Sequence, residues 1–221
     1  MNTGISDAVD LAWKIAARRE GWGGEKLLAS YETERRPIGL FNTREAADNY
    51  DKSGTIFAVP EALEEDGAAG EAARAAVAAL LPLKIKHFAP IGVHLGSAYE
   101  TSPLIIDDGT PPVPFDPVRY TPSARPGQRA PHAWLASRQS TLDLFGHGFT
   151  LLRFGDAGGE PLIEAARAAE LALNIADIAD AAIARLYGRC LVLVRPDGHV
   201  AWRGDSVPAR PRAIIDRIRG A

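Results

Sequence analysis

Apolar and polar positions recur with different periods along this chain, and these periods predict where helices and strands form. Between residues 5 and 19 apolar side chains return every three or four positions, which is typical of an amphipathic helix. Six of them share one face: Ile5, Ala8, Leu11, Ala12, Ile15 and Ala16. A glycine-rich turn at 21–24 ends this helix. A second helical stretch begins near Glu25, and Pro37 inside it predicts a kink or a break.

The middle of the chain changes character twice. Residues 60–81 are rich in Ala and Glu and predict a helix, whereas residues 91–106 alternate apolar and polar side chains, which predicts one or two strands. The run from 107 to 131 holds seven prolines and two glycines. This composition predicts irregular linker chain with a domain boundary inside it.

The last hundred residues predict a small α/β domain. The expected elements, in chain order, are a strand at 149–154, a helix at 160–174, a strand at 184–188, a hairpin at 189–204 and a closing helix at 211–220. The hairpin turns at Pro196, Asp197 and Gly198, where Pro fixes one dihedral and Gly supplies a positive φ. Strand, helix, strand, strand, helix is the second half of a thioredoxin-like order.

Composition and charge exclude several classes of function. The 221 residues are 46% hydrophobic and 24% charged, as in an ordinary globular protein, and the net charge of -3 favours neither nucleic acid nor an anionic membrane as partner. No apolar run approaches the ~20 residues of a membrane helix. The single cysteine, Cys190, excludes an internal disulfide and a CxxC pair, and it predicts a buried structural thiol in a reducing, cytoplasmic compartment.

Other candidate sites favour structural roles. The five histidines lack metal-ligand spacing, so no metal site is expected, and His132 and His199 are interpreted as structural. Asp107 and Asp108 are adjacent, which suits a turn better than a general acid–base pair. Trp134 and Trp202 are expected to fill the core of the C-terminal domain.

The first fourteen residues, MNTGISDAVDLAWK, carry a specific pattern. They resemble the second FAD-binding motif of the class A flavoprotein monooxygenases of the phenol and 2,4-dichlorophenol hydroxylase type. Asp10 stands where that family often has Asn. The positions that match are Met1, Asn2, Thr3, Gly4, Asp7, Ala8, Leu11, Ala12, Trp13 and Lys14.

The resemblance implies a role for the start of this helix in binding FAD. In the family, the loop and the helix N-terminus face the pyrimidine edge of the flavin, where the reduced cofactor gathers negative charge. Free backbone N–H groups and the helix dipole stabilise such charge, by ~0.3–1 kcal/mol for the dipole alone. The implied cofactor-binding residues are Met1, Asn2 and Thr3, with Gly4 allowing close approach of the backbone.

Two further segments extend the resemblance over almost the whole chain. In LLASYETERRPIG, the family pattern implies that five residues pack the helix structurally: Tyr31, Glu34, Arg35, Arg36 and Pro37. RPGQRAPHAWL, at 125–135, matches the connection into the family's C-terminal domain. That domain is thioredoxin-like, lacks redox cysteines and is thought to serve packing and dimer formation.

The resemblance implies an α/β fold in three parts: helices of an FAD-binding domain at 1–50, connecting structure at 51–122 and a thioredoxin-like domain at 123–221. The implied intact enzyme uses NAD(P)H to reduce FAD and hydroxylates a phenol-like substrate with O₂. No substrate base is assigned. The chain has no GxGxxG fingerprint, so we expect a truncated reading frame or a start assigned at a methionine inside the motif.

Two alternatives belong to different classes of function. The chain could be a non-catalytic, dimer-forming module that never binds FAD, and an exposed apolar patch where further domain structure should pack would favour it. A thioredoxin- or peroxiredoxin-type redox protein is disfavoured by the single cysteine in a predicted strand.

Overall fold

A computed structural model describes residues 2–56 and 60–221. The chain divides into two compact units. The first comprises Met1–Pro37, Ser97–Pro114 and Thr121–Ala221, and the second comprises Ile38–Gly96 and Phe115–Tyr120.

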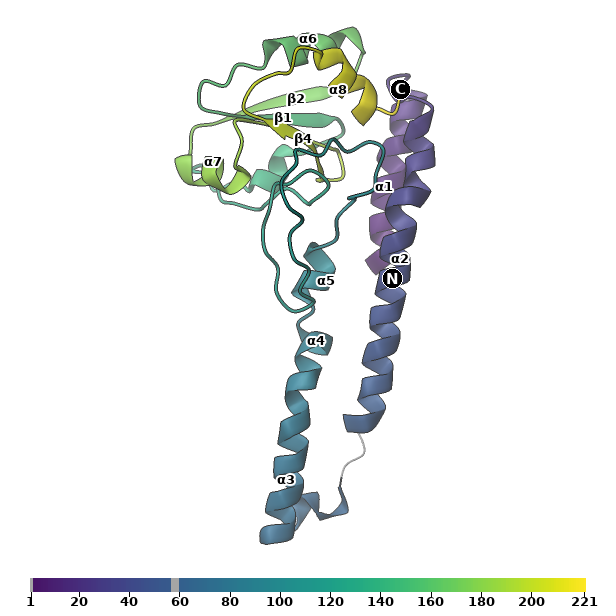
Figure 1. Cartoon of the computed structure of the whole chain (residues 1–221), viewed down its shortest axis with the longest axis vertical. Coiled ribbons are helices and arrows are strands. Elements are labelled where there is room, and N and C mark those ends of the chain that lie inside the picture. The colour runs from purple at the N-terminus through teal and green to yellow at the C-terminus, as the bar shows by residue number, and fades with distance from the viewer. Residues whose placement is uncertain (1, 57–59) are drawn as a thin grey trace. The chain divides into compact units, whose positions relative to one another are not determined.

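Two long helices open the chain. Helix α1 spans Asn2–Arg19, which confirms the helix predicted from its periodicity, and α2 spans Lys26–Ile56 (Figure 1). Of the kink or break expected at Pro37, the break does not occur: α2 continues through this residue. Proline removes one backbone donor and crowds the preceding turn, but the buried Glu34 and Arg35 anchor that turn through ion pairs with Arg195 and Asp7.

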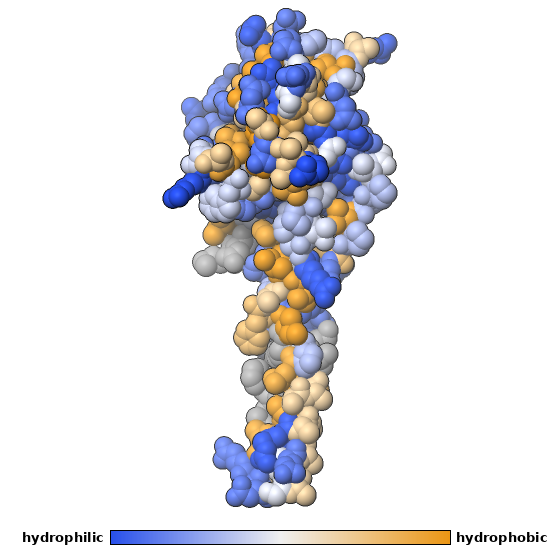
Figure 2. Space-filling model, turned by 90° about the vertical axis from the view of Figure 1, so that its left-hand side faces the viewer, coloured by the Kyte–Doolittle hydropathy of each residue, from blue (hydrophilic) through white to orange (hydrophobic). Residues whose placement is uncertain are grey.

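The second unit is helical beyond α2. Its elements are η1 (Glu61–Glu64), α3 (Ala68–Leu80), η2 (Leu81–Lys84), α4 (Ile85–Phe88) and α5 (Ile91–Leu95). Apolar side chains lie at the surface of this unit (Figure 2). Among them Leu81, Ile85, Phe88 and Ile91 are half or more exposed.

The strands expected at 91–106 do not form. Residues 91–95 are the short helix α5, and 96–106 are irregular. The apolar pattern there reflects burial of Leu104 and Ile105 without a ladder of hydrogen bonds. Single backbone bonds hold this segment instead, including one from the Ile106 N–H to the carbonyl of Ala201 at 2.9 Å.

The C-terminal part of the first unit is a four-stranded mixed sheet with helices, an α/β fold of thioredoxin-like order. The strands are β1 (Phe149–Phe154), β2 (Leu173–Ile178), β3 (Leu191–Val194) and β4 (Val200–Gly204). They lie in the order β2-β1-β3-β4, with β1 parallel to β2 and the other pairs antiparallel. The remaining elements are η3 (Thr141–Leu144), α6 (Glu160–Ala168), α7 (Ala181–Tyr187) and α8 (Pro211–Ile218).

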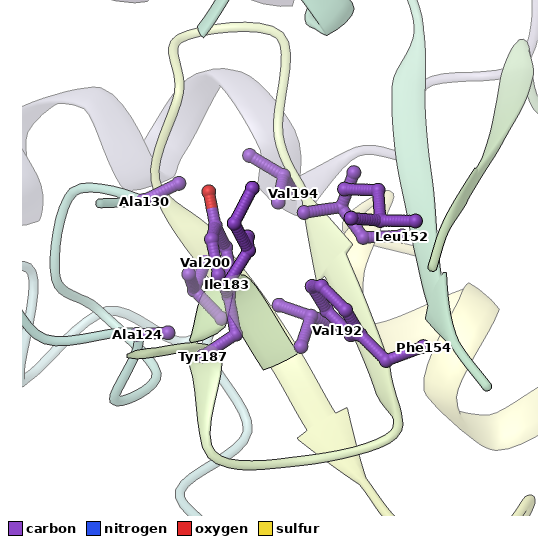
Figure 3. Close-up of a cluster of buried hydrophobic side chains, with 10 residues drawn as sticks. Ala124, Ala130, Leu152, Phe154, Ile183, Tyr187, Val192, Val194 and Val200 are labelled. Carbon is purple, nitrogen blue, oxygen red and sulfur yellow. The ribbon is translucent and has the colours of Figure 1, made fainter. Parts of the chain in front are cut away.

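Alternation along the strands creates two apolar faces, each covered by helix. On one face α7 places Ile183 and Tyr187 against Leu152, Phe154 and residues of β3 and β4 (Figure 3). Helices α6 and α8 lie on the opposite side of the sheet (Figure 1). Their buried residues are Leu162, Ala166, Ile214, Ile215 and Ile218.

Two elements of this domain differ from the prediction. The helix expected at 160–174 ends at Ala168, and β2 follows it. This strand lies at the sheet edge and buries only Ile178, so its sequence lacks a strong apolar run. The expected strand at 184–188 lies in α7, which Asp180 caps by accepting bonds from two backbone N–H groups.

Three side chains complete the comparison with the sequence. Trp202 is buried as predicted, but Trp134 is 68% exposed and does not fill the core. It packs edge-on against His132 instead, with ring centroids 4.9 Å apart. Cys190 is half-buried in a bend just before β3, so the prediction of a buried thiol within a strand was wrong.

Candidate functional site

The start of α1 is a helix N-terminus made of small and polar residues. Asn2, Thr3 and Gly4 form its first turn, where the positive end of the helix dipole lies. The turn carries no acidic side chain. Gly4 is exposed, and a Cβ added to it would meet no atom within 4 Å. The helix dipole favours negative charge at this end, and the backbone at Gly4 is accessible. Met1 lies outside the described residues.

The next turn of α1 is tied to the rest of the first unit through an arginine. Arg35 of α2 donates from Nε to Asp7 Oδ1 at 2.7 Å and from Nη1 to the Tyr99 hydroxyl at 3.1 Å. Arg35 and Tyr99 are both buried. The packing role that the resemblance implied for Arg35 thus has a physical basis, since this side chain links three segments.

Five buried charged side chains meet beneath α1, and we call them the buried ion cluster: Asp10, Lys14, Glu34, Arg195 and Asp197. Lys14 bridges Asp10 Oδ2 at 2.7 Å and Glu34 Oε2 at 2.6 Å. Arg195 holds Glu34 with two bonds, at 2.7 Å and 2.9 Å, and contacts Asp10 at 2.9 Å and Asp197 at 2.6 Å. The cluster joins α1, α2 and the β3–β4 turn.

Aromatic rings and a hydroxyl enclose the cluster. The Arg195 guanidinium lies 5.1 Å from the centroid of the Trp13 ring and 4.9 Å from that of Tyr99, close enough for cation–π attraction. The hydroxyl of Ser102 donates to Glu34. Arg195 is therefore contacted from several sides, and its side chain is fully buried.

The cluster holds two cations and three carboxylates. Burial alone would raise the pKa of Glu34, but Arg195 and Lys14 more than offset this and hold it at about 2. Burial raises the pKa of Asp10 to about 7, and Asp197 and Glu34 add to the rise against Arg195 and Lys14. The cluster has one carboxylate more than it has cations, and Asp10 is the carboxylate that gains a proton most readily.

His199 lies beside the cluster as a neutral ring. Its centroid is 4.1 Å from that of Tyr99, and its Nδ1 lies 3.4 Å from Asp197 Oδ1. Burial lowers its pKa, and the opposing influence of Asp197 does not restore it. Burial also raises the pKa of Tyr99. These two rings serve as packing, which agrees with the structural role predicted for His199.

An aromatic junction joins α1 to the sheet. Trp13 and Trp22 stack with centroids 6.3 Å apart, and both meet Phe149 of β1 edge-on, at 5.9 Å and 6.2 Å. All three side chains are buried. Such pairs contribute about 0.5–1.5 kcal/mol each beyond the area they bury.

The glycine-rich turn at 21–24 also touches the chain terminus. The Gly24 N–H donates to Arg219 O at 2.7 Å, and the Lys26 N–H donates to Gly220 O at 2.9 Å. A Cβ at Gly24 would lie 2.2 Å from Gly220 O. This turn needs glycine for close backbone approach as well as for ending the helix.

The other candidate residues are not brought into one site. Asp107 and Asp108 accept bonds from the backbone of Gly109 and Thr110, as expected of a turn. Among the described residues, no group of three or more His, Cys, Asp or Glu is placed to hold a metal ion.

Sequence reasoning matched Lys14 and Glu34 to a family pattern but did not foresee the buried ion cluster. Arg195 flanks the hairpin turn, where an arginine is normally solvated. The available signal was that charged residues match the family pattern in two separate segments, at Lys14 and at Glu34.

Two protein-family descriptions match the helices at the start of the chain and its C-terminal α/β domain. The family "Aromatic-ring hydroxylase, C-terminal" matches residues 123–221, and "FAD binding domain" matches residues 1–46. The chain belongs to the FAD-dependent aromatic-ring hydroxylase family as a C-terminal portion. Within the described residues, no helix is both long and apolar enough to cross a membrane.

Solved and curated relatives agree. The rebeccamycin biosynthetic enzyme RebC is 44% identical, with a TM-score of 0.89 over 100% of this chain and 42% of RebC. The FAD-dependent monooxygenase apdD of Emericella nidulans is 39% identical over 99% of this chain and 37% of its own length. Phenol 2-monooxygenase of Pseudomonas sp. (strain EST1001) is 31% identical over 99% of this chain and 42% of its own length. The chain spans less than half of each relative.

Proposed function

We propose that this chain is part of an FAD-dependent monooxygenase that hydroxylates a phenol-like aromatic compound and uses NAD(P)H as reductant. The observation that carries the proposal is the accessible backbone at Gly4, at the start of α1 in the segment matched to an FAD-binding domain. The proposed organisation is FAD-domain helices at 1–50, connecting structure at 51–122 and a thioredoxin-like domain at 123–221.

The residues present fit a flavin at this helix end. Met1, Asn2 and Thr3 would hold its pyrimidine edge, and Gly4 leaves room for close approach of the backbone. When bound, the flavin supplies the redox and oxygen chemistry of the reaction. The N–H groups of the first turn would stabilise negative charge that gathers on the ring.

The rest of the first unit acts on α1 as a support. Arg35 fixes Asp7 in the second turn, and the buried ion cluster fixes Asp10 and Lys14 in the third and fourth. Groups held in place before a ligand binds need no costly reorganisation. The proposed contribution of the C-terminal domain is therefore to position the helix that faces the cofactor.

A flavin absorption spectrum tests the assignment. The 221-residue protein is incubated with FAD and desalted, and retained flavin bands are expected. Gly4→Asp places a negative charge in the first turn, where it favours the helix but repels an electron-rich ring. We expect at least tenfold weaker FAD retention with an unchanged or higher unfolding midpoint, whereas Gly39→Ala retains FAD normally. Equal retention by Gly4→Asp would contradict the proposed contact.

One observation supports a second candidate function. The exposed apolar side chains Ile5, Val9 and Ile15 of α1 are what a non-catalytic interaction or dimer-forming module would present. Absence of retained flavin, together with a dimeric mass in solution, would favour this alternative.

A further inference from the structure

A polar pocket lies in the first unit, between the segment 100–107, the turn at 125–126 and helix α8. Its volume is about 250 Å³. Pockets for drug-sized molecules span about 300–1,000 Å³, so this one suits a smaller molecule. Two acids and two arginines line it: Glu100, Asp107, Arg125 and Arg217. Among the described residues, neither α1 nor the buried ion cluster contributes to this lining.

Arg125 is buried but loosely paired. Only 9% of its side chain is exposed, yet its Nη1 lies 3.3 Å from Glu100 Oε1 and its Nη2 lies 3.5 Å from Asp107 Oδ1. A guanidinium and a carboxylate normally meet at about 2.7–2.9 Å. Arg203 of β4 follows this rule, with its Nε 2.7 Å from Asp108 Oδ2. Since a buried cation requires a close partner, the Nη edge of Arg125 can donate to the oxygens of a ligand.

Arg125 is held in place at its other edge. Its Nε donates to the Thr110 carbonyl at 2.9 Å, and Arg203 Nη2 donates to the Thr110 hydroxyl at 3.2 Å. The two acids opposite are more exposed, Glu100 to 46% and Asp107 to 64%. Surface ion pairs contribute little to stability, so these carboxylates can turn toward another cation at low cost, whereas the guanidinium stays fixed.

Arg217 of α8 supplies a second cation. Its Nε donates to the Pro103 carbonyl at 3.1 Å, and among the described residues nothing accepts from its Nη1 or Nη2. The wall beside it is anchored, because the Ser102 hydroxyl donates to Glu34 and accepts from the Leu104 N–H at 3.1 Å. Both arginines and this wall are therefore in place before a ligand arrives.

We propose that the pocket binds a small zwitterion, with the ligand carboxylate between Arg125 and Arg217 and the ligand ammonium between Glu100 and Asp107. The four side chains carry no net charge together. A simple anion would meet both acids, and a simple cation would meet both arginines. A molecule with one charge of each sign, of the α-amino acid class, complements all four.

Apolar atoms on the same wall select the probe. Pro103, Ile105 and Pro126 line the pocket beside the charged groups, where they suit a short aliphatic side chain. L-Valine has such a side chain, and two analogues remove one charge each: 3-methylbutanoate lacks the ammonium, and L-valinamide lacks the carboxylate. Isothermal titration calorimetry of the 221-residue protein should show that L-valine binds at least tenfold more tightly than either analogue.

Two substitutions distinguish a charge-specific site from a structural effect. Arg217→Gln removes a carboxylate partner, so it should weaken L-valine binding at least tenfold and leave L-valinamide binding unchanged. Glu100→Gln removes an ammonium partner, so it should weaken L-valine binding but strengthen that of 3-methylbutanoate, which is no longer repelled. Arg212→Gln is the matched control, because Arg212 is also an exposed arginine of α8 but does not line the pocket. It should bind L-valine like the wild type.

Three results would overturn the inference: no binding of L-valine at millimolar concentration, equal affinity for 3-methylbutanoate, or the same loss of affinity in Arg212→Gln. Thermal unfolding without ligand confirms that each variant folds, as expected for substitutions of exposed side chains. FAD retention by Gly4→Asp tests the flavin contact separately, because no pocket residue lies on α1.

Discussion

Arg195 and Glu34 stand 161 residues apart in the chain and form a two-pronged ion pair, with Nη1–Oε1 at 2.7 Å and Nη2–Oε2 at 2.9 Å. Both side chains are fully buried. Taking such charges out of water is expensive, and the pair repays the cost only while every carboxylate keeps a cation. The position of α1 therefore depends on Arg195, a residue of the β3–β4 turn.

Removal of Arg195 tests this dependence. Arg195→Met leaves Asp10, Glu34 and Asp197 with only Lys14 as a cation, and we expect a loss of about 3–5 kcal/mol in the free energy of unfolding. Arg195→Lys keeps the charge but loses the planar fork, so its loss should be smaller. Urea unfolding followed by circular dichroism measures both variants.

The matched control is an exposed arginine. Arg189 pairs with Asp205 at 2.9 Å at the surface, where ion pairs contribute about 0–1 kcal/mol. Arg189→Met should therefore unfold close to the wild type. If Arg195→Met behaved like Arg189→Met, the ion cluster would not hold α1 in place.

The excess carboxylate of the cluster predicts a pH dependence of stability. Burial raises the pKa of Asp10 from 3.8 to about 7. The folded protein thus holds a proton that the unfolded chain releases, and the resulting stabilisation is full below pH 4 and lost as pH rises through 7. Relative to Asp10→Asn, the wild type should lose on the order of 2 kcal/mol in its free energy of unfolding between pH 5 and pH 8.

Neighbouring groups do not obscure this comparison. The lowered pKa of His199 acts with opposite sign, because its stabilisation is present above pH 6.5 and lost as pH falls, but it is shared by both proteins. Glu34, at about 2, titrates below the window. Denaturant unfolding at several pH values measures the difference, and parallel curves for the two proteins would show that Asp10 stays ionised throughout.

Sequence patterns correctly predicted those elements that depend on interactions between residues close together in the chain. The period of α1, the apolar run of β1 and the turn chemistry of Pro196 and Gly198 each act within a few residues, and each element forms as expected. β2 and α7 were misplaced because an edge strand needs little apolar surface and because a cap at Asp180 outweighs strand propensity.

The buried ion cluster was beyond sequence reasoning for a different reason. Hydropathy places Lys14 and Arg195 at the surface, and only the tertiary fold brings Glu34 to both of them and Asp10 to Arg195. The start of α1 was identified by its motif, yet its role in binding FAD stays a prediction. Which face of α1 is buried was also inaccessible, because apolar periodicity favours burial of Ile5 and Ile15, whereas the structure buries Asp10 and Lys14.

Substitutions at Trp202 and Trp134 should differ in their effect on stability. Trp202 is 6% exposed and Trp134 is 68% exposed. Trp202→Ala should cost about 3–5 kcal/mol, since it leaves a cavity in the core, whereas Trp134→Ala should change the free energy of unfolding by about 0.5 kcal/mol or less. Thermal and denaturant unfolding measure both. A large loss in Trp134→Ala would mean that another surface covers this side chain.

Two glycines should respond in opposite directions to the same substitution. A Cβ at Gly24 would lie 2.2 Å from Gly220 O, so Gly24→Ala must push the chain terminus from its place and should cost about 1–3 kcal/mol. A Cβ at Gly39, inside α2, meets nothing within 4 Å. Gly39→Ala should therefore stabilise the protein by about 0.5–1 kcal/mol through helix propensity. Unfolding midpoints that move in the same direction for both variants would show that the terminus does not pack on the turn at Gly24.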